Sequence, residues 1–133
     1  MLFSKDITKL WIASEEPGQK HDRAQVALKR LRKKYPDAKI ALEYGNNIQL
    51  LCAVIMSAQA TDKKVNEITA GLFKKYRTVN DFANADPKKF AAEIREIGFY
   101  RAKALAVVTS ARIIRDKFGG KLPRTMKEML LLR

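Results

Sequence analysis

Apolar residues recur along most of the chain at the three- and four-residue spacing of an amphipathic helix. Between Asp22 and Tyr35 the lysines and arginines lie elsewhere on the predicted helix than the apolar residues, which are Ala24, Ala27, Leu28, Leu31 and Tyr35. The same spacing predicts helices over residues 61–76 and 100–118, and a short helical turn is expected over residues 78–85. The chain is therefore expected to fold from helices.

Residues 48–58 are apolar at almost every position, interrupted only by Gln49 and Ser57. A helix that is hydrophobic all round belongs in the centre of a bundle. A buried strand is the alternative, because a short apolar run does not distinguish the two by its periodicity. Asn46 and Asn47 offer an N-cap directly before the run, which favours a helix.

Capping residues also stand where the other elements should begin or end. Thr61 or Asp62 can cap the helix over residues 61–76, and Gly119-Gly120 offers a left-handed C-cap after residue 118. Asp86 followed by Pro87 predicts the start of a helix that Gly98 ends. Thr125 and Glu128 have the S/T-x-x-E spacing of a capping box, which predicts a last helix through the C-terminal leucines.

The helical pattern near the N-terminus is interrupted at Pro17 and Gly18. We therefore expect an N-terminal arm at residues 1–21 and one partial helical domain at residues 22–133. The predicted fold class is all-α, a multi-helix domain. The last helix has only begun its apolar pattern at Arg133, which suggests a truncated element, because isolated helices this short are marginal.

The net charge adds a partner to this picture. Lysine and arginine number 27 against 14 aspartates and glutamates, giving a formal charge of +13 and a pI near 10.0. Such a balance favours a polyanionic partner, nucleic acid first. A highly charged solvated surface or attraction to a membrane surface are the alternatives. The apolar run is too short for a membrane span, and the N-terminus lacks a secretory signal, so a cytoplasmic, nucleoid-associated protein without a membrane partner is expected.

A self-contained active site is not evident in the sequence. The chain has one histidine, His21, and one cysteine, Cys52, and contains neither an H-E-x-x-H nor a G-x-S-x-G motif. His21 is expected in a solvated loop, and Cys52 is expected to be a buried, unreactive thiol. A lone cysteine forms neither an internal disulfide nor a multi-thiolate metal site. We therefore predict no metal ligands.

Two segments between predicted helices carry candidate chemistry, S-A-Q-A-T-D at residues 57–62 and I-G-F-Y-R-A-K-A at residues 97–104. Helix N-termini and basic side chains are where phosphates bind. The candidate DNA-binding residues are Gln59, Thr61, Phe99, Tyr100, Arg101 and Lys103. The alternative is that Gln59 merely caps a carbonyl group and that Phe99 packs into the core.

These two segments, followed by G-G-K-L-P from Gly119, resemble the endonuclease III family of helix-hairpin-helix DNA glycosylases over residues 22–133. The resemblance implies base excision repair, in which a damaged pyrimidine is flipped from duplex DNA, its glycosidic bond is cut and the strand is cleaved by β-elimination. It also implies that Gln59 fills the gap left by the base and that Phe99 is a wedge, commonly leucine. Val54 stands where adenine-removing relatives carry a glutamate, which favours a pyrimidine specificity.

The chain departs from this family at its C-terminal end. The hairpin L-P-G-V-G-R-K-T-A with its nucleophilic lysine, a later aspartate and a four-cysteine iron-sulfur loop do not occur within residues 1–133. The resemblance therefore implies the N-terminal part of a DNA glycosylase and AP lyase, with no catalytic residue and no cofactor in this chain and no activity by itself. A non-enzymatic basic helical DNA-binding protein is the alternative. The expected partner is double-stranded DNA, and apolar helix faces left uncovered favour self-association.

Overall fold

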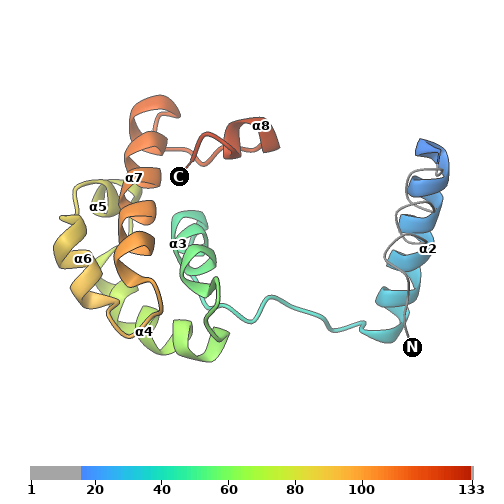
Figure 1. Cartoon of the computed structure of the whole chain (residues 1–133), viewed down its shortest axis with the longest axis horizontal. Coiled ribbons are helices and arrows are strands. Elements are labelled where there is room, and N and C mark those ends of the chain that lie inside the picture. Colours follow the sequence, from blue (N-terminus) through green and yellow to red (C-terminus); the bar gives the residue numbers. More distant parts are fainter. Residues whose placement is uncertain (1–15, 133) are drawn as a thin grey trace, which may run out of the picture. The chain divides into compact units, whose positions relative to one another are not determined.

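The computed structural model describes residues 16–132, and the chain divides into two compact units, residues 1–40 and 41–133. All regular secondary structure among the described residues is helical, which confirms the all-α prediction (Figure 1). The described helix of the first unit is α2 (Pro17–Lys34). Those of the second are α3 (Asn47–Ser57), α4 (Asp62–Lys75), α5 (Val79–Ala83), α6 (Pro87–Glu93), α7 (Tyr100–Lys117) and α8 (Met126–Met129).

Helix α2 begins earlier than the sequence pattern predicted. Pro17 is its first residue, where a proline costs no intrahelical hydrogen bond, so it starts the helix instead of interrupting it. The predicted start at Asp22 was therefore wrong, and His21 lies within the helix and not in a loop. The predicted arm, residues 1–21, falls mainly outside the described residues. No residue of α2 is buried.

Four helices of the unit 41–133 begin at the caps that the sequence predicted. The side chains of Asn46, Thr61, Asp86 and Thr125 each accept a hydrogen bond from a backbone N–H in the first turn of α3, α4, α6 and α8. Pro87 follows Asp86 in the first turn of α6. Each cap satisfies an N–H group that the helix itself leaves without an acceptor. Short-range sequence signals thus fix where these helices start.

The core of the unit 41–133 is built around α7, which packs against α3, α5 and α6, while α3 also packs against α4. The apolar residues of α7 that are buried are Ala104, Val107, Val108, Ala111 and Ile114. An aromatic cluster lies between α4, α5 and α6: the Tyr76 ring stacks on Phe82 at 5.3 Å between centroids and meets Phe90 edge-on at 5.1 Å. This core fixes the ends of α3 and α7 relative to each other.

Two predicted helices are shorter than expected. Helix α6 ends at Glu93 and not at Gly98, because a turn follows in which the N–H of Ile97 donates to the carbonyl of Ile94 at 2.9 Å. That turn buries both isoleucines. Helix α8 ends at Met129, and Leu130 and Leu131 after it are exposed, whereas Leu132 packs against the core.

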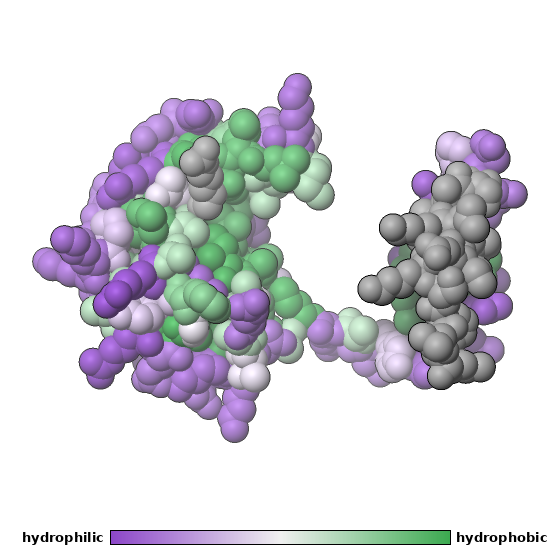
Figure 2. All heavy atoms as spheres, in the orientation of Figure 1, coloured by the Kyte–Doolittle hydropathy of each residue, from purple (hydrophilic) through white to green (hydrophobic). Residues whose placement is uncertain are grey.

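The sequence pattern predicted that α3 would be buried on all sides in the centre of a bundle, but one face of α3 is exposed. Its neighbours α4 and α7 cover part of it, and Val54 remains 47% exposed. Figure 2 shows hydrophobic side chains gathered over α3 and α8, whereas hydrophilic ones cover the outer margin over α4 and α6. No helix in residues 16–132 combines the length and apolar character that a membrane crossing requires.

Candidate nucleic-acid interface

Two side chains singled out from the sequence stand on unusual backbone. Gln59 has φ 56° and Phe99 has φ 58°, and these are the non-glycine residues with positive φ in the described part of the chain. The left-handed region costs an L-residue about 1 to 2 kcal/mol, because its Cβ crowds the following carbonyl oxygen. Strain of this kind concentrates at functional sites, so both turns are candidate functional segments.

Gln59 lies in the turn between α3 and α4. The N–H of Ala60 donates to the carbonyl of Ser57 at 3.1 Å and closes the turn. The Thr61 hydroxyl caps α4 by accepting the N–H of Lys64 at 3.2 Å. The Gln59 side chain is exposed and has no hydrogen bond to the described residues, so it does not cap a carbonyl group there.

Phe99 lies immediately before α7 and is its N-cap residue. Its side chain is 70% exposed, which excludes the alternative that it packs into the core. Tyr100 is half-buried against the core, and the guanidinium of Arg101 lies 5.4 Å from the centre of its ring. Phe99 forms no side-chain capping hydrogen bond to α7 in the part of the chain that the structure describes. An aromatic ring and a cation are therefore presented beside helix N–H groups.

Lys103 lies differently from the expectation that it contacts phosphate. Its side chain points inward, and its ammonium donates to the carbonyl groups of Met56 at 2.9 Å and Ala58 at 2.5 Å. Burial among these groups lowers the pKa of Lys103, because desolvation penalises the charged form. The two carbonyl groups already hold the ammonium, so this geometry does not present Lys103 to a phosphate, and its role as a DNA-binding residue stays a prediction.

A second link joins the same two segments at the surface. Lys64, in the first turn of α4, forms an ion pair with Glu96, which lies in the turn that precedes Phe99. The hydrogen bond between them raises the pKa of Lys64 and lowers that of Glu96. Both side chains are exposed, so the pair contributes little to stability.

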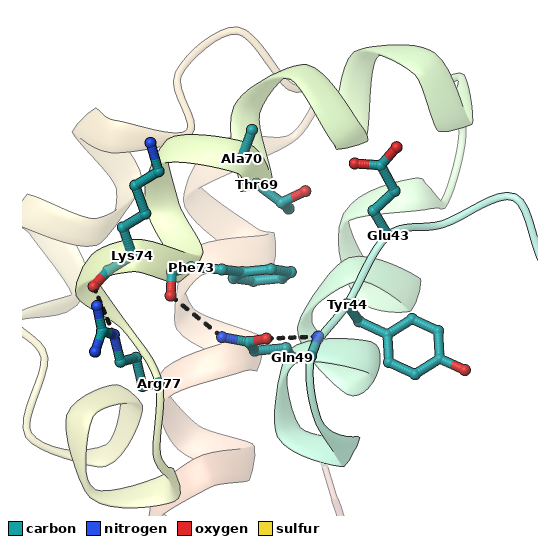
Figure 3. A pocket seen from close by; sticks show the side chains of 9 residues that line it. Glu43, Tyr44, Gln49, Thr69, Ala70, Phe73, Lys74 and Arg77 are labelled. Carbon is teal, nitrogen blue, oxygen red and sulfur yellow. Dashed lines mark hydrogen bonds between the residues drawn. The ribbon is translucent and has the colours of Figure 1, made fainter.

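Gln49 is a buried polar residue whose role the sequence did not reveal (Figure 3). Its Oε1 accepts the N–H of Gly45 at 2.8 Å, and its Nε2 donates to the carbonyls of Phe73 and Tyr76 at 3.3 and 3.0 Å. These bonds attach the loop before α3 to the end of α4, beside a pocket of about 390 Å³. A β-carbon at Gly45 would lie only 3.0 Å from the Gln49 Oε1, so a glycine suits this position. The sequence signal for this contact was a glutamine within an apolar run, four residues after a glycine.

Cys52 is a buried free thiol, with its Sγ 3.7 Å from Met56 Sδ. Desolvation raises the pKa of this thiol to about 12, which keeps it protonated and unreactive, as the sequence predicted. An iron-sulfur cluster is held by several thiolates, and the chain has one cysteine. These 133 residues therefore do not fit such a cluster by themselves.

Residues 52–130 match the family described as HhH-GPD superfamily base excision DNA repair protein. The chain is 40% identical over 113 residues to Endonuclease III of Synechocystis sp., covering 85% of this chain and 52% of that protein. It is 32% identical over 108 residues to Endonuclease III of Bacillus subtilis, covering 81% of this chain and 49% of that protein. The chain thus spans about half the length of these relatives.

Solved structures agree with the sequence comparison. A trapped Endonuclease III–DNA covalent intermediate, the estranged-adenine complex, is similar with a TM-score of 0.74 and 37% identity, over 84% of this chain and 52% of that one. A thermostable thymine-DNA glycosylase has the same fold, with a TM-score of 0.70 and 21% identity, over 85% of this chain and 54% of that one. The chain belongs to the HhH-GPD superfamily of base excision DNA repair proteins and, within it, to the endonuclease III family.

Proposed function

We propose that this chain supplies the base-extruding surface of an endonuclease III-like glycosylase and AP lyase that acts on damaged pyrimidines in duplex DNA. The observation that carries the proposal is the pair of exposed side chains on left-handed backbone, Gln59 and Phe99. Neither side chain has a structural role among the described residues that accounts for its strained position. A ligand that receives both would account for it.

Opening the double helix costs free energy that a base-extruding protein must recover. Extruding a base costs a few kcal/mol of stacking and pairing. An apolar wedge between base steps and a polar group in the vacated space recover part of that cost. Phe99 suits the first role, since its ring can stack on bases. Gln59 suits the second, since its amide both donates and accepts hydrogen bonds.

The groups beside these two residues suit the DNA backbone. Arg101 is exposed at the start of α7, and the Thr61 hydroxyl and the Tyr100 ring lie next to the two turns. The charge of +13 supplies the non-specific attraction to phosphates. We place the protein with the nucleoid in the cytoplasm on this ground. The exposed, uncharged Val54 on α3 supports a pyrimidine specificity rather than adenine removal.

We propose further that strand cleavage uses residues outside these 133. Lyase chemistry needs an amine at the sugar C1′. Lys103 is hydrogen-bonded to both turns, but its ammonium already donates to two carbonyl groups. Incubation of the chain with abasic duplex and borohydride should therefore trap no covalent adduct. A stable adduct would show that one of its own lysines is the nucleophile.

Binding to damaged and undamaged duplex tests the base-extruding role. We expect Gln59→Ala and Phe99→Ala each to weaken binding to duplex with an abasic-site analogue by about tenfold at one fixed salt concentration, with little effect on undamaged duplex. Asn80→Ala and Leu130→Ala are matched controls, because they remove an exposed amide and an exposed apolar side chain elsewhere in the unit 41–133. Both controls should bind as the unaltered chain does.

Equal losses on damaged and undamaged duplex would contradict the proposal. They would favour the alternative of a basic helical protein that binds only the backbone. A fluorescent base analogue beside the lesion gives a second readout, because its emission rises when the neighbouring base leaves the stack. No difference in emission between the unaltered chain and Phe99→Ala would argue against a wedge.

A further inference from the structure

Lys103 is bonded to both turns of the candidate interface. Its backbone N–H donates to the carbonyl of Phe99 at 3.0 Å in the first turn of α7. Its ammonium donates to the carbonyl groups of Met56 and Ala58, which lie at the end of α3 and directly before Gln59. One residue thus joins the backbone of one turn to the backbone of the other.

The carbonyls that Lys103 reaches belong to the end of a helix. The last carbonyls of an α-helix have no intrahelical donor, and they form the negative end of the helix dipole. An ammonium placed there satisfies them and opposes the partial charge. The Lys103 side chain is only 7% exposed, so its ammonium has exchanged most of its water for these two oxygens.

A buried ammonium is a costly means of attaching two segments. Taking a charge out of water is unfavourable unless its hydrogen bonds are replaced, and an apolar side chain would avoid that cost. Directional bonds to two carbonyls, however, fix the orientation of a turn in a way that apolar packing does not. The turn held in this way is the one that keeps Gln59 in the left-handed region.

We propose that Lys103 is a positioning residue that holds the Gln59 turn against the start of α7, so that Gln59 and Phe99 meet DNA as one rigid unit. The proposal rests on the proposed function, because it assigns both side chains to the opened helix. It replaces a phosphate contact by Lys103 with an internal one. The two roles differ in how binding responds to salt.

Binding of the whole 133-residue chain distinguishes positioning from phosphate contact. A lysine that contacts phosphate releases a counterion on binding, so its loss lowers the slope of log Kd against log salt by about one. We expect Lys103→Met to leave this slope unchanged on undamaged duplex and to reduce the preference for the abasic analogue by about tenfold. Arg101→Met should lower the slope. Lys103→Arg should restore most of the preference, since guanidinium also donates to two carbonyls.

Hydrogen exchange tests the turn without DNA. The Ala60 N–H, which closes the Gln59 turn on Ser57, should exchange about tenfold faster in Lys103→Met, while amides in the core of α7 keep their rates. Lys64→Met is the matched control, because it removes the same charge from the exposed link between the same segments. Its Ala60 N–H should exchange at the rate of the unaltered chain.

Three results would overturn the proposal. A slope lowered by Lys103→Met as much as by Arg101→Met would assign Lys103 to phosphate. Exchange that rises equally at Ala60 and in the core would show a merely global loss of stability, and unchanged exchange at Ala60 would show that Lys103 does not hold the turn. If the unaltered chain has no preference for the abasic analogue, the proposed function fails, while the Ala60 exchange still decides whether Lys103 holds the turn.

Discussion

Helices α2 and α7 are each 18 residues long, and each ends in a basic turn. Seven residues of α7 are buried, whereas α2 has no buried residue. An isolated helix of this length is marginal in water, and most helical stability in proteins comes from packing of an apolar face. Equal length and a similar pattern therefore do not imply equal stability, and α7 should be the later of the two to melt.

The largest effect should come from removing a packed side chain. Ile114 of α7 is fully buried, and Leu31 of α2 is 54% exposed. Ile114→Ala should lower the free energy of unfolding by about 2 to 4 kcal/mol, because it loses burial and leaves a cavity. Leu31→Ala should change it by less than about 0.5 kcal/mol. Urea denaturation followed by circular dichroism measures both, and similar losses would mean that α2 is packed as well as α7.

Glycine substitutions should separate the helix ends. Gly119 follows α7 with φ +60°, and the N–H of Gly120 returns to the carbonyl of Ile114 at 3.0 Å. Gly119→Ala should destabilise the protein by about 1 kcal/mol, because alanine is strained at positive φ. Gly18 lies in the first turn of α2 with open space at its Cβ position, so Gly18→Ala should raise helicity. A higher melting temperature for Gly119→Ala, or a lower helicity by circular dichroism for Gly18→Ala, would contradict these expectations.

The packed unit should also respond to pH through Cys52. The unfolded thiol ionises near its ordinary pKa of 9.0, whereas the buried thiol keeps its proton until about 12. The native state then binds more protons than the unfolded state, so the free energy of unfolding falls as pH rises between these values. At pH 10 the loss should be roughly 1 kcal/mol relative to pH 8. Cys52→Ala should flatten this part of the profile, and an unaltered profile would exclude Cys52 as its cause.

The smallest effect concerns self-association. Leu31 of α2 and Leu131 after α8 are both exposed, and exposed apolar surface promotes association. The sedimentation coefficient should rise slightly with concentration, and Leu31→Lys should reduce this rise. Gln25→Lys adds the same charge at an exposed polar position of α2 and should have less effect. Sedimentation as a monomer at every concentration would refute the prediction.

Local signals made much of the fold predictable. The caps at Asn46, Thr61, Asp86 and Thr125 lie within a few residues of the N–H groups they satisfy, so the sequence alone locates them. The glycine pair after α7 was equally legible, because few residues other than glycine adopt positive φ.

Contacts between distant segments were not predictable in this way. Gln49 bonds to residues 24 and 27 positions away, and Lys103 to residues 47 and 45 positions away. A polar residue in an apolar stretch can face water or satisfy a buried carbonyl, and the sequence pattern does not distinguish these. The sequence predicted the candidate site through Gln59 and Phe99, but it did not predict that Lys103 is hydrogen-bonded to both turns.

The backbone at Gln59 and Phe99 has a consequence for how this protein can vary. Glycine at either position would relieve the left-handed strain, and neither side chain contributes burial that glycine would forfeit. Selection for thermal stability alone should therefore enrich glycine at both positions in a library of variants. If Gln59 and Phe99 have the proposed role, selection for binding to duplex with an abasic-site analogue should retain glutamine and a bulky apolar residue, so the two selections should diverge at these two codons.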